Sequence, residues 1–115
     1  MNFNKIKERS NGVCELCYIE RAVHMHHSLM GSKRKAQESV ESVYHLGERC
    51  HTLVHKDRLV NLLLIFTTQN RYISQGIVAD QLRNKMGGMI YSEDDILKVD
   101  SNISGEKVKK IMEGI

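Results

Sequence analysis

The spacing of apolar and polar residues predicts a short helix and two strands in the first part of the chain. Residues 3–10 fit a helix that ends at the turn signal Asn11-Gly12. Residues 21–27 (RAVHMHH) and 43–46 (VYHL) contain alternating, β-compatible residues and predict two strands. The stretch between them, residues 28–42, is polar and loop-like.

Helical patterns follow the second predicted strand. Residues 48–63 (ERCHTLVHKDRLVNLL) fit one helix, and a second is expected from about 68 to 86, with Gly87-Gly88 as its stop. The acid-rich stretch 92–95 is typical of a helix first turn, and residues 104–113 fit a last short helix. The order strand, loop, strand, helix is a ββα unit, so we expect an α+β fold with additional helices.

Length and composition allow a single domain over residues 1–115 with a modest core. Hydrophobic residues make 41% of the chain, but aromatic residues make only 5%, and a small domain of this kind often needs a staple such as a metal. The polar amino end predicts no signal peptide, and the longest apolar run, residues 62–66, is too short to span a membrane. We therefore expect a soluble, cytoplasmic protein whose three cysteines are metal ligands rather than disulfides.

Four of the six histidines fall in two tight groups, His26 with His27 and His51 with His55. Histidines four apart share one helix face, and neutral imidazole is the commonest protein ligand for transition metals. Adjacent strand residues point to opposite sides, so one of the first pair can join the metal while the other takes a proton from water. Metal-assisted hydrolysis requires such an open site with a free imidazole. The alternative is a set of scattered surface histidines.

The order of "CELC", "VHMHH" and "LGERCHTLVH" resembles the zinc-knuckle HNH endonucleases of the ββα-metal superfamily. That family has a CxxC pair, a histidine pair, an asparagine, then CxxCH and a histidine four residues further on. The resemblance covers residues 12–56, about two-fifths of the chain. It implies an HNH core at 12–56, a helical extension at 57–115, and a divalent-metal nuclease that hydrolyses DNA phosphodiester bonds.

The resemblance also implies roles for individual residues. His27 would be the general base that activates water, while His26, His51 and His55 would hold a divalent ion (Mg, Mn, Ni or Zn) that stabilises the scissile phosphate. The family asparagine, which holds the loop next to the base, falls at Ser42. A serine hydroxyl can donate a hydrogen bond, but over a shorter reach, so this position bears on activity.

The zinc knuckle of the family is incomplete in this chain. Cys14 and Cys17 match its first half and Cys50 its last cysteine, but Gly47 stands where the remaining cysteine would be. A structural zinc requires four ligands, and His45, two residues earlier, is the expected substitute. The alternative is a site that has lost its zinc and keeps three cysteines in an apolar cluster.

The basic run Lys33, Arg34 and Lys35 would grip the DNA backbone without sequence preference, unless it is only a solvated surface. Two rival functions are a weak or inactive HNH-like regulator that binds nucleic acid or protein, and a zinc-stapled module without a catalytic metal. The four-histidine set favours the enzyme, because a binding module has no need of a free imidazole beside a metal ligand. A homodimer through the helical second half is also open.

Overall fold

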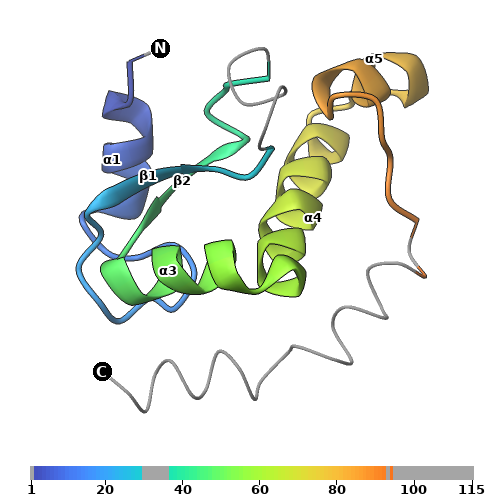
Figure 1. The fold of residues 1–115 in the computed structure, drawn as a ribbon. Helices are drawn as coiled ribbons and strands as arrows, with labels where there is room; N and C mark the ends of the chain where they lie inside the picture. The colour runs from blue at the N-terminus through green and yellow to red at the C-terminus, as the bar shows by residue number, and fades with distance from the viewer. Residues whose placement is uncertain (1, 30–36, 93, 95–115) are drawn as a thin grey trace.

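The computed structural model describes residues 2–29, 37–92 and 94. These residues form an α+β fold, which confirms the predicted class, and β1, β2 and α3 follow one another in the expected ββα order (Figure 1). The described elements are α1 (Asn4–Ser10), β1 (His24–His27), β2 (Val43–Leu46), α3 (Glu48–Lys56), α4 (Arg58–Ser74) and α5 (Ala79–Lys85).

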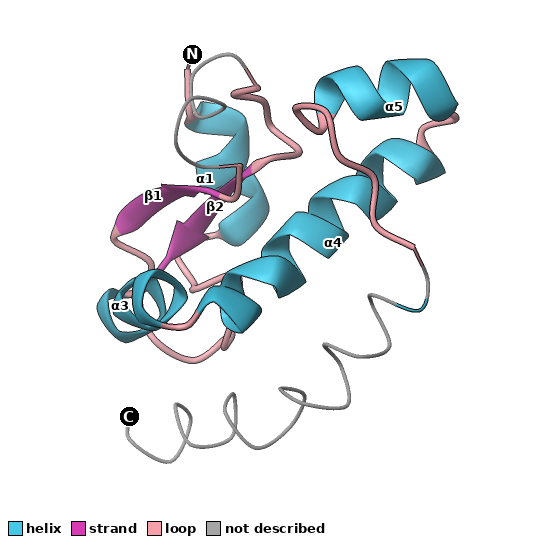
Figure 2. Ribbon diagram, turned by 45° about the vertical axis from the view of Figure 1, so that its right-hand side comes forward, coloured by secondary structure: helices cyan, strands magenta, loops and turns pink. Residues whose placement is uncertain are grey.

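The two strands form an antiparallel sheet with a different helix on each side. His24 pairs with Leu46 and His26 with Tyr44 in the register. Because successive side chains alternate across a strand, the even-numbered residues of both strands face α3 and the core, and the odd-numbered residues face α1. Figures 1 and 2 both show α1 above the strands and α3 below them. This alternation decides which histidines can meet.

Two breaks divide the helices that the sequence pattern predicted as continuous. The predicted helix 48–63 is wrong as a single element, because Asp57 adopts φ −119° and ψ 103° and its carboxylate accepts a 3.0 Å hydrogen bond from the Leu59 amide. Asp57 thereby caps α4. The predicted helix 68–86 is also two pieces, since Gly76 at φ +82° turns the chain between α4 and α5.

The core lies between the sheet, the cysteine-bearing loop and the helices α3 and α4. A second, smaller cluster joins α4 to α5. The main cluster contains Cys14, Cys17, Tyr44, Leu46, Cys50, Val54, Val60, Leu64 and Phe66. None of the helices among the described residues has the length and apolar character needed to cross a bilayer. The helix predicted at 104–113, and most of the one predicted from 92, lie outside the described residues.

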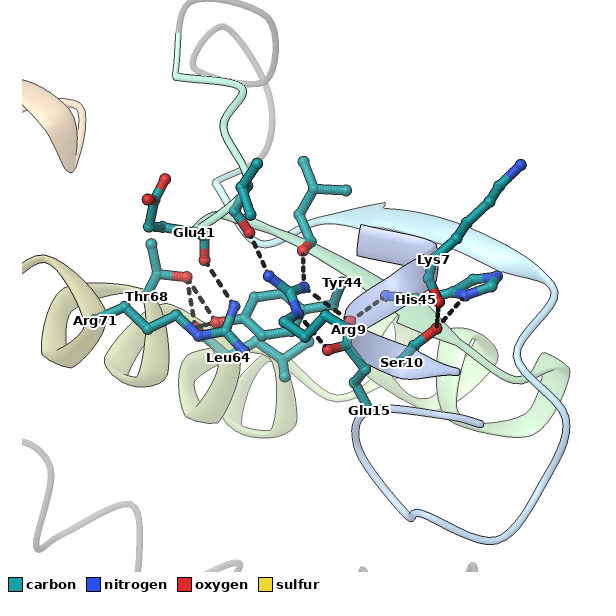
Figure 3. A network of polar contacts seen from close by, with 12 residues as sticks. Lys7, Arg9, Ser10, Glu15, Glu41, Tyr44, His45, Leu64, Thr68 and Arg71 are labelled. Atoms are coloured by element: carbon teal, nitrogen blue, oxygen red, sulfur yellow. Dashed lines mark hydrogen bonds and ion pairs between the residues drawn. The ribbon is translucent and has the colours of Figure 1, made fainter. Parts of the chain in front are cut away.

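A polar network fixes β2 between α1 and α4 (Figure 3). The Arg9 guanidinium donates to both carboxylate oxygens of Glu15, at 2.6 and 2.8 Å, and to the carbonyl of Val43. On the other side of the strand, the buried Tyr44 hydroxyl donates to the Leu64 carbonyl at 3.0 Å. Charge-assisted, two-pronged bonds of the Arg9 kind are among the stronger polar contacts in proteins. The strand that pairs with His24–His27 is therefore tied to both α1 and α4.

Two candidate metal centres on one helix

The first centre is a group of three imidazoles. His26 comes from β1, and His51 and His55 come from the exposed side of α3. Their ligand nitrogens lie within 4.8 Å of one another, and Nε2 of His51 is 3.1 Å from Nε2 of His55. Two nitrogens about 2.1 Å from one cation, at angles near 90–109°, stand roughly 3.0–3.4 Å apart. The spacing of this pair fits two ligands of one ion.

The buried side chain of Asn61 sets the tautomer of His26. The Asn61 amide nitrogen donates to the Ser28 carbonyl at 3.1 Å, so its Oδ1 is the atom that faces His26 Nε2, at 2.7 Å. That oxygen can only accept, so Nε2 carries the proton and Nδ1 keeps the lone pair that a metal needs. Burial lowers the pKa of His26 to about 4, which keeps the ring neutral at pH 7.

His24 supports the imidazole group from its outer edge. Its ring stacks on His51 with centroids 4.4 Å apart, and its Nε2 lies 2.6 Å from Glu48 Oε2. This hydrogen bond lowers the pKa of Glu48, and burial with the neighbouring His24 lowers the pKa of His51. The structure thus places His24 against a candidate ligand.

His27 lies on the opposite face of β1 from His26, as alternation requires. Its side chain is only 8% exposed, and its Nε2 is 2.6 Å from Oε2 of Glu38. The bond to His27 is the main reason that the pKa of Glu38 is lowered. A carboxylate accepts hydrogen bonds and does not donate them, so in the neutral form of His27 the proton is on Nε2 and the lone pair is on Nδ1.

Ser42 forms hydrogen bonds that hold the segment containing Glu38 in place. It is 1% exposed, and its Oγ donates to the Gln37 carbonyl at 2.8 Å and accepts from the Ser39 amide at 3.0 Å. These bonds close the chain from residue 37 to residue 42 into a tight turn. Ser42 thus contacts the loop that the family asparagine was expected to hold. Lys33, Arg34 and Lys35 lie outside the described residues.

The second centre is a buried group of thiols beside a carboxylate. Cys14, Cys17 and Cys50 are at most 3% exposed, and their sulfur atoms lie within 4.8 Å of one another and of a carboxylate oxygen of Glu20. None of the three forms a disulfide. A hydrogen bond from Cys50 lowers the pKa of the Cys14 thiol to about 5, and the same contact raises the pKa of Cys50.

His45 does not complete the thiol group, and Glu20 occupies the place predicted for it. Tyr44 and Leu46 point into the core with the cysteines, so His45 between them faces α1. There its Nδ1 is 2.8 Å from the Ser10 hydroxyl (Figure 3).

Comparisons of the chain with protein-family models, with curated proteins and with solved structures found no match. The two centres are therefore interpreted from their own geometry and from the residue types that form them.

Three side chains that the sequence analysis passed over contact the predicted site residues or join them: Glu20, Asn61 and Glu38. Glu20 follows Cys17 by three residues, a spacing common among metal ligands, and this signal was available in the sequence. Asn61 and Glu38 gave no local signal, because their histidine partners lie 35 and 11 residues away along the chain. Such pairings depend on tertiary structure alone.

Proposed function

We propose that this protein is a metal-dependent DNA endonuclease of the HNH type. In this proposal His26, His51 and His55 hold one divalent cation, and His27 is the general base that activates water. The proposal rests on the positions of four histidines. Three gather at ligand spacing, while the fourth lies on the other strand face with only Nδ1 left to accept a proton.

The residues of the chain account for the proton transfer. His27 Nδ1 would take a proton from water as the oxygen attacks phosphorus, and the imidazolium would be stabilised by the Glu38 carboxylate at Nε2. Ser42 would keep Glu38 in reach by closing its loop. The bound cation would supply positive charge for the phosphate and the leaving oxygen.

Arg58 and Asn61 line a cavity of about 310 Å³ whose other lining side chains are mostly apolar. Asn61 contacts His26 on one side and lines this cavity on the other, where Arg58 also contributes. A guanidinium suits phosphate recognition because its donors match two oxygens at once. Lys33, Arg34 and Lys35 would add contacts to the DNA backbone.

The test is plasmid cleavage with magnesium, manganese, nickel or zinc, and with EDTA, by the parent and by His27→Ala. We expect cleavage with at least one ion and none with EDTA. The His27→Ala variant should be slower by about 100-fold or more, the usual size of a general-base effect. His45→Ala is the matched control, because His45 contacts Ser10 outside both centres.

Equal cleavage rates for His27→Ala and the parent would refute the assignment of the base. If the parent binds DNA but cuts it with none of these ions, the endonuclease proposal fails and the regulator becomes the better description.

A further inference from the structure

We infer that the thiol group is a zinc site with three cysteine ligands and one glutamate ligand, in which Glu20 replaces the side chain that residue 47 lacks. The site would bind Zn²⁺ through Cys14, Cys17, Cys50 and one oxygen of Glu20. This inference concerns the stability of the fold and holds whether or not the protein cuts DNA.

The contact between Glu20 and Gly47 is the first reason. A Cβ atom built on Gly47 would lie 1.9 Å from Glu20 Oε1 and 2.2 Å from both Cγ and Cδ. Real Cβ atoms do not approach other atoms so closely, so a side chain at position 47 and the present Glu20 side chain exclude each other. Glu20 therefore fills the volume in which a cysteine at position 47 would lie.

Helix capping alone does not explain this arrangement. Glu20 Oε1 does accept a 3.2 Å hydrogen bond from the Cys50 amide in the first turn of α3, where Gly47 has no side chain to cap the helix. Capping, however, gives no reason for a carboxylate to face three thiols at less than 4.8 Å. Cysteines must ionise to bind a metal, and the resulting thiolates repel a carboxylate unless a cation lies between them. A shared cation removes this repulsion and satisfies the capping contact as well.

The sulfur and oxygen atoms of this group favour zinc over magnesium and calcium. Zinc binds cysteine sulfur at about 2.3 Å and carboxylate oxygen at about 2.0–2.2 Å, so tetrahedral ligands stand roughly 3.5–3.8 Å apart. The atoms of this group already lie within 4.8 Å of one another. Magnesium and calcium prefer oxygen ligands, and the group has only one carboxylate to offer. Its burial and four ligands are typical of structural zinc.

The site also bears on the imidazole group, because Cys50 and His51 are consecutive residues of α3. Zinc bound at Cys50 would fix the start of this helix against the loop of Cys14 and Cys17. His51 and His55 would then approach His26 from a fixed position.

Cobalt(II) added to the chelator-treated full-length chain tests the inference, with zinc(II) as competitor. Charge-transfer absorption from thiolate to cobalt reports this site alone, because the imidazole group has no sulfur ligand. Glu20→Gln keeps an oxygen that can accept from the Cys50 amide but removes the charge. The double variant Glu20→Ala with Gly47→Cys again provides four ligands. Its alanine at position 20 avoids the steric overlap with a side chain at position 47. Glu8→Gln, an exposed position, and His45→Ala are controls.

We expect Glu20→Gln to bind cobalt and zinc at least about tenfold more weakly than the parent, and the double variant to regain tight binding. The thiolate band of the double variant should be about one-third stronger, because four sulfur ligands replace three. Circular dichroism at saturating metal checks that each variant is folded. Unchanged metal affinity in Glu20→Gln would mean that Glu20 only caps the helix. Weaker metal binding in His45→Ala would mean that His45 is the fourth ligand. Either result, or a parent without a thiolate band, overturns the inference.

Discussion

The two candidate centres start from consecutive residues of α3 but differ in almost every physical property. The group at Cys50 is buried, contains three sulfur atoms and has a fourth ligand at hand. The group at His51 has three imidazoles, and two of them come from the more exposed side of the helix. A closed set of four ligands suits a structural ion, whereas three ligands with open positions suit catalysis.

The difference shows how one short helix can contribute residues both to a buried thiol group and to a surface imidazole group. Neighbouring helix residues point about 100° apart, so Cys50 enters the core while His51 stays at the surface beside His24. An ion bound at the buried group should therefore matter for folding, and an ion bound at the surface group should matter only for chemistry. The following variants separate these effects.

Cys14→Ser should have the largest effect. If zinc binds at the thiol group, losing one buried ligand should cost more than about 4 kcal/mol of unfolding free energy, a size typical of a lost metal site. Thermal melts followed by circular dichroism measure this, and a chelator should lower the melting temperature of the parent in the same way. A zinc-free parent that melts cooperatively and ignores the chelator would show that the cysteines are ordinary core residues.

Asn61→Leu should weaken metal binding at the imidazole group by about tenfold or more, because it removes the acceptor that fixes the His26 tautomer. Asn61→Asp keeps an acceptor at the same place and should retain most of the affinity. Calorimetry with nickel on both variants measures the difference. Equal affinities in the leucine variant and the parent would mean that Asn61 does not orient His26.

Glu38→Gln should lower the cleavage rate roughly tenfold, a fraction of the full general-base effect, because the neutral amide stabilises the His27 imidazolium less well. DNA binding and metal binding should stay at parental values, since Glu38 contacts neither group of candidate ligands. Single-turnover cleavage, with binding measured separately, distinguishes these quantities. If Glu38→Gln lowers only the affinity for DNA, Glu38 does not assist His27 as the general base.

Ser42→Asn should have the smallest effect on cleavage. Ser42 already bonds both ends of its turn and is buried, so the larger amide has little room and should cost about 1–3 kcal/mol of stability. Urea unfolding and a plasmid assay check this. A clear rise in cleavage would mean that the serine limits the rate by holding the loop too loosely.

The sequence predicted the fold class, the bounds of β2 and nearly those of α1, because these depend on local patterns. It missed the break at Asp57, although aspartate favours N-caps, because helical patterns of apolar residues stand on both sides of it. The exclusion of His45 followed from strand alternation and could have been read from VYHL itself. Glu38 and Asn61 were beyond local patterns, because each meets its histidine only through the folded hairpin and α4.

The most direct test of the roles given to the four histidines is calorimetric titration with manganese or nickel. The protein is first loaded with about one zinc ion per chain, enough for the thiol group alone. The proposal predicts about one bound ion per chain at the imidazole group in the parent and in His27→Ala, and none in His51→Ala. Equal binding by His51→Ala and the parent, or loss of binding in His27→Ala, would contradict it.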